Sequence, residues 1–78
     1  MIAAAQIRAA RALVGLTADD LAVRAGLSWA TVQRFEAAEG IPPSRSGNLQ
    51  KVKSALEAAG VEFIGDPITS PGVRLRRR

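Results

Sequence analysis

The chain has 78 residues and a formal net charge of +4, and it contains no cysteine and no histidine. This length suffices for one small domain with a modest core. The composition excludes disulfides and a Cys/His zinc site, and it removes the commonest general base. The seven acidic residues are scattered or suit the start of a helix. We therefore expect no cofactor, no bound metal and no enzymatic activity.

The placement of apolar and charged residues indicates where the protein is located in the cell and what it can bind. No apolar run approaches the ~20 residues of a membrane-spanning helix, and Arg8 and Arg11 interrupt the apolar N-terminal stretch, unlike a signal peptide. These features predict a cytoplasmic protein with no membrane association. A basic chain favours polyanions such as nucleic acid, although a merely soluble basic surface is the simpler alternative. Four of the eleven basic residues end the chain: Arg74, Arg76, Arg77 and Arg78.

Residues 3–14 form the first predicted helix, which Gly15 ends. Apolar residues recur on one of its faces at helical spacing, namely Ile7, Ala10 and Val14. Arg8 and Arg11 fall together on another face. A solvated surface and a contact with phosphate groups are equally good interpretations of these two arginines.

A second helix follows between Thr17 and Gly26. The Thr17 hydroxyl can accept a hydrogen bond from the amide of Asp20, which occupies the capping-box position. Its buried side is built from Leu21, Ala22 and Ala25. Gly26 ends the helix, since glycine adopts the left-handed backbone conformation without a steric penalty.

Ser28 begins a third helix, "WATVQRFEA", in which Val32 and Phe35 face the core. Two short helices joined through a tight turn that contains glycine form a helix-turn-helix. The small Ala22 allows the two helices to approach each other, and Leu27 fills the corner between them.

The stretch "EGIPPSRSGN" is rich in turn-forming residues and is predicted to be a loop. A fourth helix spans 48–59, with a stripe of Leu49, Val52 and Leu56. Residues 61–64 alternate as in a strand, and a second short strand begins at 73–75. The chain thus divides into a helix-turn-helix domain over 1–60 and a β extension with a basic tail over 61–78.

The stretch "IRAARALVGLTADDLAVRAGLSWATVQRFEA" resembles the XRE family, which includes the DNA-binding domains of phage Cro and repressor proteins. The resemblance covers residues 2–60, and the tail is similar to that of short bacterial members. It implies a mainly α fold: a four-helix Cro/repressor-like helix-turn-helix domain with a short C-terminal β-hairpin or strand extension. Two departures stand out: Ala18 occupies a position that is often Gln, and Trp29 one that often has a short polar side chain.

The resemblance also implies that the recognition helix, about residues 28–37, enters the major groove of DNA. Base-facing positions would be Trp29, Ala30 and Arg34. Phosphate or supporting contacts would fall on Thr17, Ser28, Thr31 and Gln33. In the loop after this helix, Arg45 is a candidate for a phosphate or minor-groove contact.

Trp29 allows several interpretations. Its indole can pack against a thymine methyl group or the sugar–phosphate backbone, or it can contact another protein. Alternatively, it is partly buried against the loop around Pro42 and Pro43.

These features predict a sequence-specific DNA-binding transcriptional regulator, such as a repressor, that binds a palindromic operator as a homodimer. Its partners would be double-stranded DNA and a second copy, with strands 61–64 and 73–75, alone or together with the fourth helix, as the expected dimer surface. The alternative is a protein-interaction module of the same fold, an antitoxin or antiactivator, because exposed Trp is enriched at interface hot spots.

Overall fold

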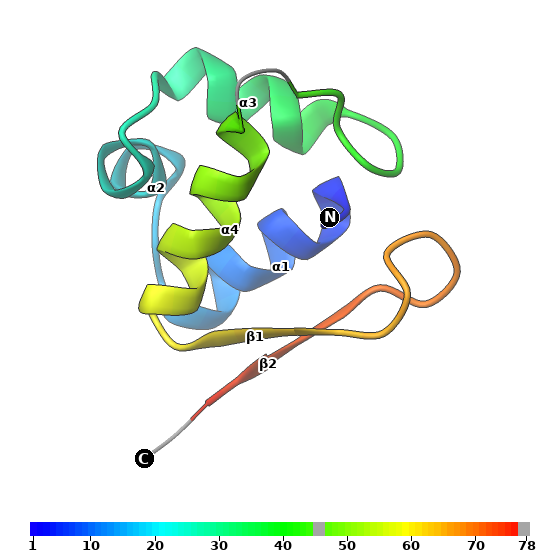
Figure 1. Ribbon diagram of the computed structural model, residues 1–78. Coiled ribbons are helices and arrows are strands. Elements are labelled where there is room, and N and C mark those ends of the chain that lie inside the picture. Colours follow the sequence, from blue (N-terminus) through cyan, green and yellow to red (C-terminus); the bar gives the residue numbers. More distant parts are fainter. Residues whose placement is uncertain (45–46, 77–78) are drawn as a thin grey trace.

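Four helices precede a two-stranded antiparallel sheet in the computed structural model, which describes residues 1–44 and 47–76 (Figure 1). The helices are α1 (Ala4–Val14), α2 (Ala18–Ala25), α3 (Trp29–Ala37) and α4 (Asn48–Ala58). The strands are β1 (Val61–Ile64) and β2 (Gly72–Leu75). The predicted mainly α fold with a C-terminal hairpin is confirmed.

The core lies where the four helices meet. Its largest fully buried side chains come from all four helices, the N-terminal segment and the hairpin: Ile2, Ile7, Leu21, Val32, Phe35, Val52, Leu56 and Val61. The stripes predicted from helical periodicity are thus the residues that pack together. Because Val61 on β1 belongs to this core, the hairpin shares its packing with the helices. The division of the chain at residue 60 stays a prediction.

The hairpin is fastened to α1 by the buried side chain of Gln6. Gln6 Oε1 accepts a hydrogen bond from the amide of Ala3 at 2.8 Å, and Nε2 donates to the carbonyl of Gly72 at 2.9 Å. Both ends of the amide are therefore partnered, as burial of a polar group requires. This contact fixes β2 against the first turns of α1.

The turn between α2 and α3 has the conformation that the sequence predicts. Gly26 adopts φ 71°, in the left-handed region. Its amide donates to the carbonyl of Val23 at 3.2 Å, and the amide of Leu27 donates to the carbonyl of Ala22 at 2.9 Å. This pair of bonds is the Schellman motif, which satisfies the last carbonyls of a helix. The chain then reverses directly into α3.

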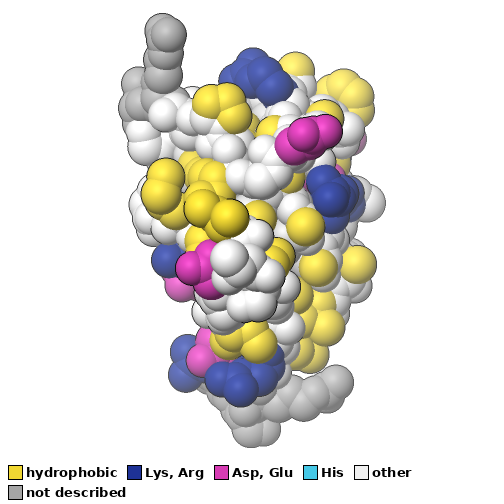
Figure 2. Space-filling model, turned by 90° about the vertical axis from the view of Figure 1, so that its right-hand side faces the viewer, with side chains coloured by type: hydrophobic (Ala, Val, Ile, Leu, Met, Phe, Trp, Pro, Cys, Tyr) yellow, Lys and Arg dark blue, Asp and Glu magenta, His cyan; other side chains and the backbone are white. Residues whose placement is uncertain are grey.

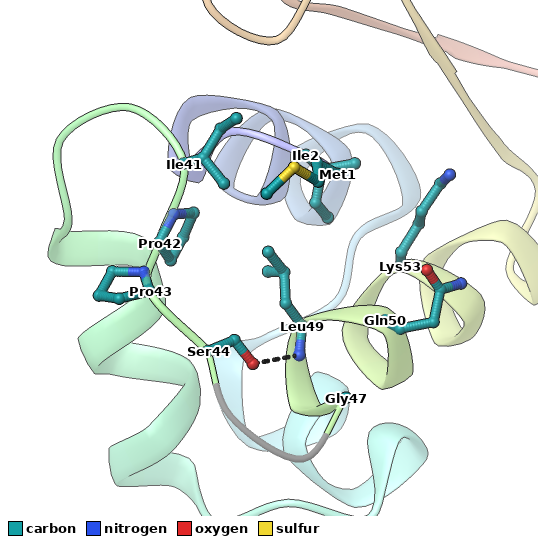
Figure 3. Close-up of a pocket in the computed structure, with 10 residues that line it drawn as sticks. All are labelled: Met1, Ile2, Ile41, Pro42, Pro43, Ser44, Gly47, Leu49, Gln50 and Lys53. Atoms are coloured by element: carbon teal, nitrogen blue, oxygen red, sulfur yellow. Dashed lines mark hydrogen bonds between the residues drawn. The ribbon is translucent and has the colours of Figure 1, made fainter.

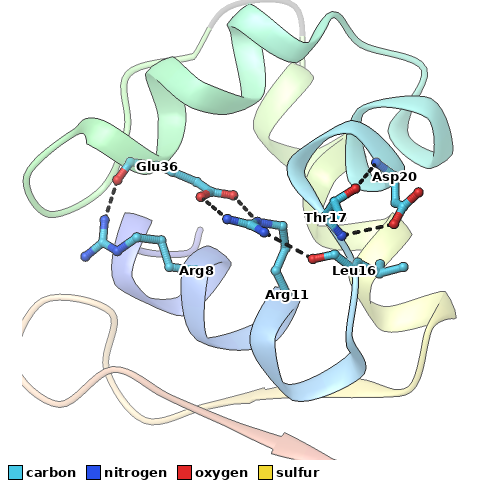
Figure 4. Close-up of polar contacts among 6 residues, drawn as sticks. All are labelled: Arg8, Arg11, Leu16, Thr17, Asp20 and Glu36. Atoms are coloured by element: carbon cyan, nitrogen blue, oxygen red, sulfur yellow. Dashed lines mark hydrogen bonds and ion pairs between the residues drawn. The ribbon is translucent and has the colours of Figure 1, made fainter.

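The predicted capping box is present at the N-terminus of α2. Thr17 Oγ1 accepts from the amide of Asp20 at 3.0 Å, and Asp20 Oδ2 accepts from the amide of Thr17 at 3.0 Å (Figure 4). The backbone amide of Thr17 and, to a smaller extent, its side chain favour the ionised carboxylate of Asp20 by hydrogen bonding. They lower the pKa of Asp20 below its ordinary value of 3.8.

This shift makes stability depend on pH in the acid range. A carboxyl group with a lowered pKa in the folded state stabilises that state above its unfolded pKa, and the contribution is lost as the pH falls from 3.8 through the folded value. We expect the melting temperature of Asp20→Asn to fall less than that of the wild type between about pH 4 and about pH 2. Parallel thermal melts measure this. A difference between the two proteins that is independent of pH would contradict the role of the Asp20 charge.

Candidate nucleic-acid interface

The helix α3 presents two opposite faces. Val32, Phe35 and Glu36 are buried, whereas Trp29, Ala30 and Arg34 are exposed and Gln33 is half-buried. Spacing of four residues places Trp29 beside Gln33, and Ala30 beside Arg34, on one surface. The base-facing positions that the sequence predicts therefore share the solvent side of this helix.

Trp29 is 54% exposed, at the first turn of α3. This exposure excludes full burial of the indole, while partial packing against the loop around Pro42 and Pro43 stays one interpretation. Exposure of a large aromatic side chain to water is unfavourable and therefore uncommon, and it leaves the ring available to a binding partner.

The guanidinium of Arg34 is also accessible. Its Cζ lies 5.9 Å from the centre of the Phe35 ring, at the outer limit of a cation–π contact. The ion pairs recorded within residues 1–44 and 47–76 join Arg11 to Glu36 and Arg74 to Glu62. Arg34 takes part in neither, so its donors can bind an acceptor on a ligand.

The hydroxyl groups at the N-termini of α2 and α3 form hydrogen bonds within their own helices. Ser28 Oγ accepts from the amide of Thr31 at 3.1 Å and lies 2.9 Å from Thr31 Oγ1, just as Thr17 caps α2. These caps leave the N-termini of α2 and α3 at the surface, where helix dipoles favour anions. Phosphate contact by Thr17, Ser28 and Thr31 stays a prediction.

The buried face of α3 is held by an ion pair that the sequence did not reveal (Figure 4). Arg11 on α1 donates from Nε to Glu36 Oε2 at 2.6 Å and from Nη2 to Glu36 Oε1 at 2.8 Å. Its Nη1 also donates to the carbonyl of Leu16 at 3.1 Å. The hydrogen bonds that Arg11 donates to Glu36 raise the pKa of Arg11 above its already high ordinary value. This bidentate pair fixes α3 relative to α1.

The structure gives both α1 arginines partners within the protein, and contact of the exposed Arg8 with phosphate stays a prediction. Arg11 is 24% exposed and is directed to protein partners, because Glu36 and the carbonyl of Leu16 accept hydrogen bonds from its Nε, Nη1 and Nη2. Arg8 also reaches α3, donating from Nη1 to the backbone carbonyl of Glu36. A clue was present in the sequence, since Glu36 follows Val32 by four residues and so falls on the buried side.

A family model described as a helix-turn-helix domain matches residues 2–62. The chain belongs to the helix-turn-helix family. The match spans all four helices and the start of β1, and it confirms a helix-turn-helix domain of the XRE/Cro-like kind. Membership indicates a DNA-binding regulator, in a family that is typically not enzymatic. The curated proteins include none that matches the chain.

The other basic residues that the sequence singled out in the loop and the tail lie outside the described ranges or at their end. Arg45, predicted to contact phosphate or the minor groove, lies outside the described residues, as do Arg77 and Arg78. Arg76 is exposed at the end of the described chain, where its amide donates to the carbonyl of Gly60. None of the helices in the described part of the chain is long and apolar enough to cross a membrane.

Proposed function

We propose that the protein regulates transcription by binding specific DNA sequences, with α3 inserted in the major groove. The exposed face of Trp29, Ala30 and Arg34 supports this most directly, because it projects from a helix whose opposite face is locked in the core. An arginine in the major groove can donate two hydrogen bonds to O6 and N7 of guanine. Apolar side chains beside it can contact the methyl group of thymine. Binding to chromosomal DNA would place the protein in the cytoplasm.

Phosphate contacts would position this helix. The capped N-termini of α2 and α3 offer backbone amides and a positive dipole end to the DNA backbone. Thr17, Ser28, Thr31 and Gln33 are the proposed phosphate or supporting contacts. Arg45 is proposed on its sequence position alone.

We infer a homodimer that binds a palindromic operator. One such domain reads only a few base pairs, and a two-fold dimer reads two half-sites about one helical turn, ~34 Å, apart. The hairpin is the proposed interface. Phe63, Val73 and Leu75 remain half-buried, and Ile64 is 37% exposed. In the two-stranded sheet each strand also has one open edge, which can pair with another chain.

Selection of bound fragments from a random DNA pool, followed by footprinting, tests this proposal. We expect a two-fold symmetric site that is protected over two half-sites. The logarithm of the affinity should fall linearly with the logarithm of the salt concentration, since each phosphate contact releases counterions. If no sequence is enriched, or if binding does not depend on salt, the proposal fails.

The exposure of Trp29 also favours a second candidate, a protein-interaction module such as an antitoxin or antiactivator. Val23 on α2 is likewise exposed, at 81%. Exposed aromatic and apolar side chains of this kind are typical anchors of protein interfaces. In that case a partner protein, rather than DNA, would cover Trp29.

Trp29 is the only tryptophan, so its fluorescence reports which partner covers it. We expect red-shifted emission in the free protein and a quench or blue shift when the selected DNA is added. Trp29→Ala should weaken DNA binding by about tenfold, because the apolar area of an indole is lost from the complex, and it should leave the melting temperature unchanged. Thr31→Ala should have a smaller effect on affinity. A signal that responds to a protein but not to DNA would favour the interaction module.

A further inference from the structure

A pocket of about 440 Å³ opens between the N-terminus, the loop after α3 and the start of α4 (Figure 3). It lies away from the exposed face of α3, and none of its lining residues belongs to that helix. Its volume falls within the ~300–1,000 Å³ of small-molecule sites. Figure 2 shows hydrophobic side chains gathered on the side of the molecule that carries the N-terminus and this loop.

The walls of the pocket are mainly apolar. Three separate segments supply them: Met1 and Ile2, Ile41 to Pro43, and Leu49. Figure 3 shows Leu49 pointing into the space between the prolines and the N-terminal residues. The Ser44 hydroxyl accepts from the amide of Leu49 at 2.9 Å and so joins the loop to the first turn of α4. The apolar walls suit a hydrocarbon or aromatic body.

One side of the pocket is polar and positive. Gln50 and Lys53 extend from α4 on the side opposite Pro42 and Pro43 (Figure 3). They are three residues apart on the helix and so share a face. Lys53 is half-buried, and the two ion pairs recorded in the described ranges do not include it. No acidic residue is among the described residues that line the pocket.

We propose that this pocket binds a small amphiphilic carboxylate. Its apolar body lies against Met1, Ile41 and Leu49, and its carboxylate accepts hydrogen bonds from Lys53 Nζ and Gln50 Nε2. Gln50 Nε2 donates one proton to Ser54 Oγ at 3.3 Å and has a second to offer. A positive group beside apolar walls, with no acid among them, favours an anion over a cation or a neutral molecule. This site does not depend on the proposed DNA binding.

Decanoate, kept below its micellar concentration, is the probe for the test. Calorimetric titration should show one saturable site, and amide resonances of the pocket residues should shift in NMR spectra. Lys53→Gln should weaken binding by about tenfold, because it removes a charge-assisted hydrogen bond. The matched control Lys51→Gln removes an equal charge from the exposed side of α4, outside the pocket, and should leave the affinity unchanged. The uncharged analogue 1-decanol should bind the wild type about as weakly as decanoate binds Lys53→Gln.

Four outcomes would overturn the proposal. Failure of decanoate binding to saturate would show that the pocket is no ligand site. Equal losses in Lys51→Gln and Lys53→Gln would reveal general attraction to a basic surface. Equal affinities for decanoate and 1-decanol would mean that Lys53 recognises no head group. Shifts of the pocket resonances when protein concentration rises without ligand would assign the surface to a second copy of the chain.

Discussion

Arg11→Ala is expected to lower the free energy of unfolding by about 3 kcal/mol. The Glu36 side chain is 7% exposed, so removal of its partner leaves a carboxylate buried without a counter-charge. Urea unfolding followed by circular dichroism measures the change. Arg11→Lys should rescue only part of it, because a lysine cannot form the bidentate geometry.

The hairpin provides a matched control for this ion pair. Arg74 lies 2.9 Å from Glu62 across the strands, with side chains that are 60% and 38% exposed. Arg74→Ala should therefore cost less than about 1 kcal/mol. Equal costs for the two substitutions would show that the Arg11–Glu36 pair does not fix α3. The double replacement Arg11→Met with Glu36→Leu should recover much of the loss, because no buried charge then remains unpaired.

The second large effect concerns Arg34. Arg34→Ala should reduce affinity for the selected DNA by about ten- to a hundredfold, the cost of a lost bidentate guanine contact. Affinity for random DNA should change far less, since that binding comes from phosphate contacts. Competition between the two DNAs in a binding assay separates the effects. Folding should be unaffected, because Arg34 is exposed.

Arg24→Ala is the matched control, as Arg24 is an exposed arginine in the last turn of α2. It removes the same charge without removing a proposed base contact, so its effect should be similar on both DNAs. If Arg34→Ala also weakens both DNAs equally, Arg34 contacts phosphate and the sequence is read by other residues. The positions left for that role are Trp29, Ala30 and Gln33.

The sequence alone predicted the helices, the turn and the exposed face of α3. Thr17 with Asp20, and Gly26 with its neighbours, form hydrogen bonds across three to five residues, and such local bonds are visible in the order of residues. The apolar period of Val32 and Phe35 likewise fixed which side of α3 is buried. Trp29 and Arg34 were therefore predicted on the outer side.

The contacts between residues that are far apart in the sequence became known only from the tertiary structure. Arg11 meets Glu36 across 25 residues, and Gln6 meets Gly72 across 66. The pocket likewise needs the N-terminus, the loop after α3 and α4 together. Periodicity tells which side of a helix is buried but not which side chain it meets there, because that depends on the angle and distance at which helices pack. A buried glutamate such as Glu36 is therefore explained only once the folded chain brings Arg11 to it.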